Sequence, residues 1–85
     1  MKEYQISVDK RLIKSFRKFP EKHVRQIREK LELLKTNPHP QDSVKLKTSG
    51  GYRVTAGEYR ILYTIQEDTA TVTVYLITRR NDFSY

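Results

Sequence analysis

The sequence predicts an α+β fold of the order β-α-α-β-β-β, with an N-terminal helical hairpin on one face of a small, mostly antiparallel sheet. Two patterns predict it. Apolar residues repeat with a helical period across residues 10–36, and they alternate with polar residues at residues 4–8 and again beyond residue 51. The 85 residues contain no internal repeat or linker, so we expect one domain covering residues 1–85.

The first elements are a half-buried strand and a basic helix. Apolar side chains occupy every second position of residues 4–8, which is typical of a strand with one buried face. Asp9 is a favourable N-cap for a helix that continues to the residue before Pro20. The apolar stripe of that helix consists of Leu12, Ile13, Phe16 and Phe19.

A second helix is predicted over residues 21–36, and Pro20 suits the position at its start. Leu33 lies off the apolar stripe of this helix, so we expect it to be exposed. The Pro-rich segment at residues 37–40 ends the helix, and residues 41–51 are predicted to form a loop. The stripe itself consists of Val24, Ile27, Leu31 and Leu34.

Three strands fill the rest of the chain. Residues 52–56 and 59–66 flank Gly57-Glu58, a two-residue hairpin turn with glycine first. A turn near residues 67–69 then leads into a third strand over residues 71–78, followed by a short polar tail. The helices need to cover only one face of the resulting sheet.

Strand alternation places three arginines on the open face, one from each C-terminal strand: Arg53, Arg60 and Arg79. Their guanidinium groups would suit bidentate binding of a phosphate, with Tyr75 or Tyr85 stacking on a base. A β-bulge would reverse the assignment downstream of itself. Arginines that are simply solvated are the alternative interpretation.

The same alternation places apolar side chains on the open face. Leu62, Tyr75 and Ile77 would form a strip there, which indicates a protein partner. Leu33 on the second helix is a further candidate for contact with that partner.

The net charge of +7 lies entirely in residues 1–50, which hold 13 basic and 6 acidic residues. A polyanionic partner or a solvated basic face would explain it. The absence of cysteine excludes disulfides and thiolate metal sites. His23 and His39 lack neighbours at metal-ligand spacing, so we expect neither a metal nor a cofactor. No apolar run is long enough to span a membrane, and a cytoplasmic location is expected.

Paired Tyr-Arg motifs and a terminal Arg-Arg give the second half a specific pattern. Gly51-Tyr52-Arg53-Val54 precedes Gly57-Glu58-Tyr59-Arg60, and Thr78-Arg79-Arg80-Asn81-Asp82-Phe83 ends the strand region. With the upstream Lys45-Leu46-Lys47 and the order of elements, this pattern resembles the RelE/ParE superfamily of toxins, and the RelE branch most. The resemblance covers nearly the whole chain.

The RelE-type resemblance implies a toxin that cuts mRNA in the ribosomal A site and is neutralised by a cognate antitoxin. The ribose 2′-hydroxyl would attack the adjacent phosphate without a metal ion. Arg60 would stabilise charge on that phosphate in the transition state. The other catalytic residues implied are Arg79, Arg53 and Tyr85. RNA contacts are expected from Lys45, Lys47, Arg80, Lys10, Lys14 and Arg17.

Two positions depart from the RelE pattern. Thr55 and Thr78 stand where basic side chains are common in such enzymes, so no residue is assigned as general acid or base. A ParE-like inhibitor of DNA gyrase, which is not an enzyme, is therefore the second interpretation. An inactive relative that binds RNA or titrates an antitoxin is the third.

Overall fold

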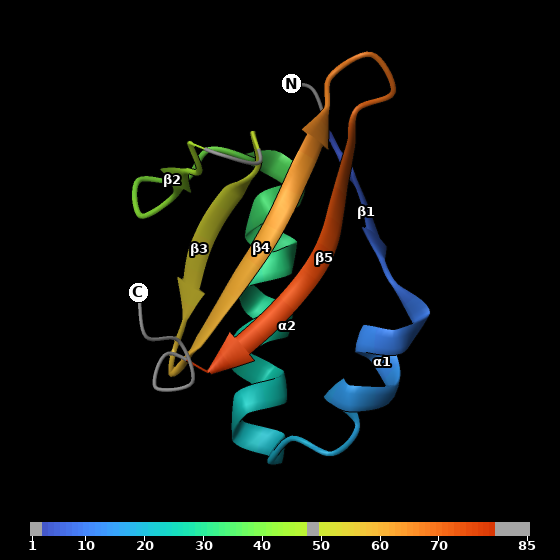
Figure 1. Cartoon of the computed structure of the whole chain (residues 1–85), viewed down its shortest axis with the longest axis vertical. Helices are drawn as coiled ribbons and strands as arrows, with labels where there is room; N and C mark the ends of the chain where they lie inside the picture. Colours follow the sequence, from blue (N-terminus) through green and yellow to red (C-terminus); the bar gives the residue numbers. More distant parts are fainter. Residues whose placement is uncertain (1–2, 48–49, 80–85) are drawn as a thin grey trace.

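The computed structural model describes residues 3–47 and 50–79 (Figure 1). Five strands form one sheet in the order β1-β5-β4-β3-β2. β1 pairs with β5 in parallel and the other three pairings are antiparallel. The elements are β1 (Gln5–Val8), α1 (Lys10–Phe16), α2 (Glu21–Thr36), β2 (Val44–Lys45), β3 (Tyr52–Ala56), β4 (Tyr59–Gln66) and β5 (Thr71–Arg79). The predicted α+β class and the mostly antiparallel sheet are confirmed.

The element bounds differ from the prediction by one residue at the start of β1 and at the end of β5, and by more in two places. α1 ends at Phe16, because residues 17–19 turn through hydrogen bonds from the amides of Lys18 and Phe19 to carbonyls three residues earlier. The second difference is β2, which forms within the predicted loop by pairing with the first residues of β3. α2 has the predicted bounds, and Asp9 caps α1 by accepting a hydrogen bond from the Arg11 amide at 2.8 Å.

The core lies between α2 and one face of the sheet (Figure 1). Ile27 and Leu34 are the fully buried side chains of the predicted α2 stripe, and each buried aliphatic side chain of this size contributes about 1.5–3 kcal/mol. The sheet contributes the inward side chains of its central strands, and α1 packs against β5. Among the described helices, none is long and apolar enough to cross a membrane. The fully buried sheet residues are Val54, Ile61, Tyr63, Val72 and Val74.

The hairpin between β3 and β4 turns at Gly57, as predicted. Its φ of 62° is in the left-handed region, which a two-residue turn with glycine first requires. A Cβ atom at this position would also collide with the side chain of Gln26 on α2. Glycine therefore satisfies both the turn and the close approach of α2.

A β-bulge divides β5 into two halves. Val74 pairs with Tyr63 and Leu76 pairs with Leu62, which leaves Tyr75 as the extra residue. The side chains beyond a bulge exchange faces relative to a regular strand. The assignments of Ile77 and Arg79 to the open face are therefore wrong, and Leu76 lies on that face instead.

Tyr63 links the sheet to the loop after α2. Its buried hydroxyl donates a hydrogen bond to the Pro38 carbonyl at 2.8 Å, and burial raises its pKa to about 12. The neutral phenol is thus favoured in the folded state. The stability that the folded protein gains from the protonated Tyr63 hydroxyl is fully present below the unfolded-state pKa of about 10. This stability is lost as the pH rises from there towards 12.

Tyr63→Phe should therefore lower the free energy of unfolding at pH 7 by about 1–3 kcal/mol, because the Pro38 carbonyl loses its donor. It should also flatten the loss of stability above pH 10. Urea unfolding from pH 7 to 11 measures both effects. Tyr75→Phe is the control, since Tyr75 is 38% exposed. An unchanged alkaline loss in Tyr63→Phe would show that another group causes it.

Candidate functional site

Arg53 and Arg60 lie on the open face of the sheet, on neighbouring strands. In the β3–β4 register, Arg53 pairs with Leu62 and Thr55 pairs with Arg60. The two arginines are therefore diagonal neighbours, a spacing that long side chains can bridge. Both residues are half-buried. For these two residues the predicted placement is confirmed.

Thr78 joins this group because of the bulge. It pairs with Arg60 across β4 and β5, on the same face of the sheet. Its Oγ1 atom is buried and has no hydrogen-bond partner among the described residues, and one guanidinium nitrogen of Arg60 is buried as well. From the sequence, Thr78 was notable only because it departs from the RelE pattern. Its position beside Arg60 could not be predicted, since the bulge has no signal in the sequence.

Arg79 does not join the other two arginines. It pairs with Tyr59 and so lies on the helix side of the sheet, where its Nη2 atom is 3.3 Å from the Glu58 carboxylate. Both side chains are more than half exposed, and such pairs are worth at most about 1 kcal/mol. The predicted convergence of three arginines is thus wrong for Arg79. Arg80 and Tyr85 lie outside the described residues.

The other predicted RNA contacts occupy opposite edges of the molecule. Lys45 pairs with Tyr52, so it is on the helix side rather than beside Arg53, and Lys47 is exposed in the following turn. The remaining three are exposed on α1 and at the residue that follows it, and α1 packs against β5 near the other sheet edge. They are Lys10, Lys14 and Arg17.

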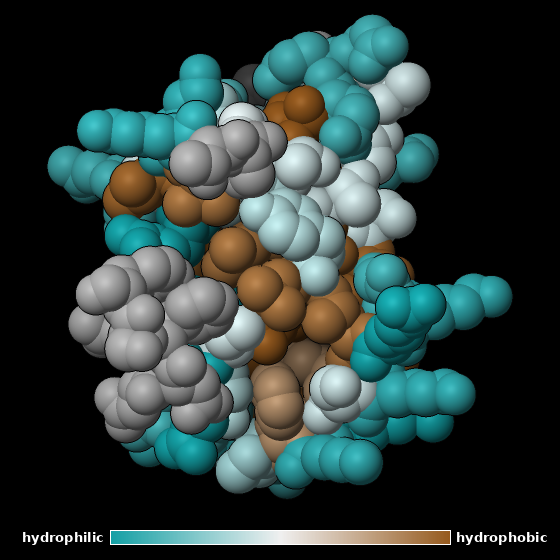
Figure 2. All heavy atoms as spheres, in the orientation of Figure 1, coloured by the Kyte–Doolittle hydropathy of each residue, from teal (hydrophilic) through white to brown (hydrophobic). Residues whose placement is uncertain are grey.

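The predicted apolar strip is only partly present on the open face. Leu62 lies there but is 8% exposed, and Tyr75 is accessible at the bulge. Ile77 instead packs against the core on the helix side. Figure 2 shows hydrophobic residues in the middle of this face and hydrophilic residues around much of its margin. Leu33 is 43% exposed on α2, in agreement with the prediction that it is exposed.

Asp42 fixes the segment before β2 to α2 and β3. Partial burial would raise the pKa of its carboxyl group. Hydrogen bonds from Lys30 Nζ, at 3.0 Å, and from the backbone amides of Asp42 and Thr55 outweigh that effect and lower the pKa. The carboxylate therefore stays ionised at neutral pH, and it holds this loop beside the edge of β3 next to Thr55.

Comparison with known proteins identifies the family. The sequence model of the ParE toxin of type II toxin–antitoxin systems, parDE, matches residues 6–83. The chain belongs to this toxin family. The ParE-family chain is also 29% identical over 82 residues to a protein named as toxin RelE1 in Methanocaldococcus jannaschii, covering 92% of this chain and 91% of that one.

Solved structures share the fold of this ParE-family toxin. The archaeal RelE–RelB complex from Pyrococcus horikoshii contains a chain with a TM-score of 0.85 and 25% identity, covering 98% of this chain and 100% of that one. The RelBE2 toxin–antitoxin complex from Mycobacterium tuberculosis gives a TM-score of 0.80 at 21% identity, covering 92% and 99%. The fold is therefore RelE-like, as the sequence predicted.

The toxin's open face offers two guanidinium groups but no described histidine. His23 packs edge-on against Tyr59, and His39 packs edge-on against Tyr52, each with ring centroids 5.0 Å apart. Both tyrosines belong to the helix side of the sheet. Within residues 3–47 and 50–79, no group of three His, Cys, Asp or Glu side chains could hold a metal ion. The arrangement is suited to binding an anion and stabilising its charge.

Proposed function

We propose that this ParE-family toxin inhibits translation in the cytoplasm by cutting mRNA on the ribosome, and that a cognate antitoxin neutralises it. The observation that carries the proposal is the diagonal pair Arg53 and Arg60 on the open face, with Thr78 beside Arg60. Two guanidinium groups at this spacing suit a phosphodiester. The relatives from P. horikoshii and M. tuberculosis, which were solved as toxin–antitoxin complexes, support the antitoxin partner.

In the proposed reaction the ribose 2′-oxygen attacks the adjacent phosphorus and loses its proton, and the bond to the 5′-oxygen breaks. The products are a 2′,3′-cyclic phosphate and a 5′-hydroxyl, whose oxygen takes up a proton. Arg60 stabilises the charge that develops on the phosphate oxygens, and Arg53 holds the same group. Arg80 would supply the cation that the sequence assigned to Arg79, and Tyr85 would stack on a base.

The basic residues outside this face would bind ribosomal RNA. Lys47 and Lys45 lie near one edge of the sheet. Lys10 and Lys14 lie on α1, and Arg17 directly follows it. Contacts of this kind are independent of sequence, and the affinity should fall steeply as the salt concentration rises.

Induced expression followed by mapping of mRNA 5′ ends tests the proposed function. We expect cuts at a fixed phase within codons of translated messages and few cuts in untranslated ones. The matched control is the chain carrying Arg60→Ala, which should leave the messages intact. Intact messages with the unmodified chain, during growth arrest, would contradict the nuclease.

Inhibition of DNA gyrase is the second candidate function. It is favoured by the match to the ParE family model and by Thr55 and Thr78, which leave the described part of the open face without a candidate base. Double-strand DNA breaks with intact messages would be its signature in the same experiment. Absence of any growth arrest, with antitoxin binding retained, would instead indicate an inactive relative.

A further inference from the structure

Arg60 lies between two threonines, in a row that crosses the three C-terminal strands. Thr55 of β3 pairs with it on one side, and Thr78 of β5 pairs with it on the other. Residues that are paired in this way have Cβ atoms about 4.5–5.5 Å apart. Both threonines are positions at which the chain departs from the RelE pattern, so two departures that are distant in the sequence meet at one arginine.

The hydroxyl group of Thr78 differs from that of Thr73, which lies on the same strand and the same face. The Thr73 hydroxyl donates a hydrogen bond to Gln66 Oε1 at 2.9 Å. The Thr78 Oγ1 atom is buried and has no hydrogen-bond partner within residues 3–47 and 50–79. Buried polar atoms are nearly always paired in folded proteins, and an unpaired one is unfavourable. The Thr78 hydroxyl therefore lowers the stability of the free chain.

Valine at position 78 would remove this unfavourable hydroxyl and keep the shape of the side chain. Val and Thr are both β-branched and both are common in strands, so the strand itself does not require the hydroxyl. An unpaired buried polar group in a native structure needs an explanation, and a role at a functional site is one of them. Arg60 is the charged residue directly opposite Thr78, so phosphate binding by Arg60 is the state in which the hydroxyl is used.

The chemistry of a guanidinium group explains how a hydroxyl helps it. The group has five N–H donors, and bidentate binding of a phosphate uses two of them. Donors that point into the sheet then need acceptors from the protein, and the Nη1 atom of Arg60 is buried. A threonine hydroxyl can accept a hydrogen bond, whereas a lysine in its place has no acceptor and would repel the guanidinium. Thr78 therefore suits a position beside a phosphate-binding arginine.

We propose that Thr78 is a positioning residue, whose hydroxyl accepts a hydrogen bond from the Arg60 guanidinium when that group binds the RNA phosphodiester. The bond holds the guanidinium plane in the orientation that contacts two phosphate oxygens. The proposal rests on the proposed function for the presence of this phosphodiester. It also makes the β-bulge part of the site, because Thr78 would face the helices in a regular strand.

Single-turnover cleavage of a message on programmed ribosomes, with the full chain, tests this role. Thr78→Val should lower the maximal cleavage rate about 10-fold and leave the half-saturating ribosome concentration unchanged, since the lost bond orients Arg60 only at the phosphate. Thr78→Ser keeps the hydroxyl and should stay within about threefold of the parent. The matched control is Thr73→Val, on the same strand and face, which should change the rate less than about twofold.

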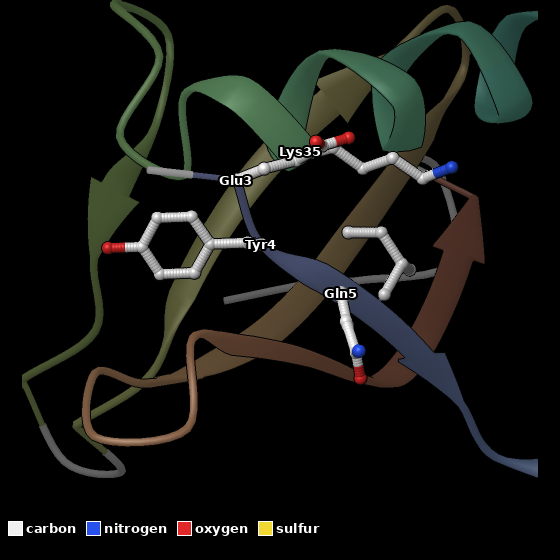
Figure 3. A pocket seen from close by; sticks show the side chains of 5 residues that line it. Glu3, Tyr4, Gln5 and Lys35 are labelled. Carbon is white, nitrogen blue, oxygen red and sulfur yellow. The ribbon is translucent and has the colours of Figure 1, made fainter. Parts of the chain in front are cut away.

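Stability provides a second readout, with a paired hydroxyl as the opposite control. Tyr4 lies at the start of β1 beside Lys35 (Figure 3), and its hydroxyl donates to the Glu67 carboxylate at 2.7 Å. Tyr4→Phe should lower the urea midpoint and leave the cleavage rate within about twofold. Thr78→Val should do the reverse, with a urea midpoint equal to or above that of the parent. A lower midpoint for Thr78→Val would show a paired hydroxyl in the free chain and overturn the proposal.

The Arg60→Lys background tests whether Thr78 acts through the guanidinium group. Lysine lacks the rigid fork that the hydroxyl orients, so adding Thr78→Val to Arg60→Lys should cost less than about twofold in rate. A full 10-fold loss in that background would mean that Thr78 acts independently, and an unchanged rate for Thr78→Val in the parent would remove its role. Either result overturns the proposal. A parent chain that cuts no message would overturn the proposed function, and the role of Thr78 with it.

Discussion

Arg60→Ala should lower the cleavage of ribosome-bound mRNA by at least about 100-fold and leave the chain folded. Loss of one group that stabilises transition-state charge typically costs this much in rate. Arg60 lies on the open face, away from the side chains that form the core, so its removal should change stability by less than about 1 kcal/mol. Single-turnover cleavage of a message on programmed ribosomes, with a thermal melt of each variant, measures both quantities.

Arg79→Ala is the matched control for that experiment. Arg79 is a strand arginine in the same hairpin, but it lies on the helix side in an exposed pair with Glu58. Its removal should change the cleavage rate less than about threefold. An equal loss in both variants would mean that Arg79 reaches the phosphate, and full activity of Arg60→Ala would remove Arg60 from the site. Arg60→Lys should recover only part of the rate, because an ammonium group cannot bind a phosphate in bidentate fashion.

Local features of the fold could be predicted from the sequence because their causes are local. Helix α2 has the predicted bounds, since the proline before it and the Pro-rich segment after it act within a few residues. The turn at Gly57 follows from one residue that accepts a positive φ. Arg53 and Arg60 were placed correctly because both precede the bulge and regular alternation holds as far as that point.

Features that depend on pairing across the sheet could not be predicted in this way. The eight residues of β4 face nine residues of β5, and nothing in the sequence of β5 itself marks Tyr75 as the extra one. The same limit applies to β2, whose two residues become a strand only because β3 lies alongside. The hollow lined by Leu12 of α1, Leu31 of α2 and Ile77 of β5 likewise requires the relative placement of these three elements, which no short-range pattern determines.

The bulge makes a second prediction with a large effect, on stability. Ile77→Asn should lower the free energy of unfolding by about 2–3 kcal/mol, because it places an amide against Ile61 and the core. Leu76→Asn should cost at least about 1 kcal/mol less, since residue 76 pairs with Leu62 on the open face, where an amide can reach water.

Urea unfolding of the two variants at pH 7 distinguishes a bulged β5 from a regular strand. A regular strand would place Leu76 in the core and Ile77 outside, so it predicts the opposite order of stability. The measured order of stability also tests the proposed site. The alternation that places Ile77 against the helices also places Thr78 beside Arg60 and puts Arg79 on the opposite face of the sheet. A larger loss in Leu76→Asn would restore Arg79 to the arginine face and would require a different catalytic set.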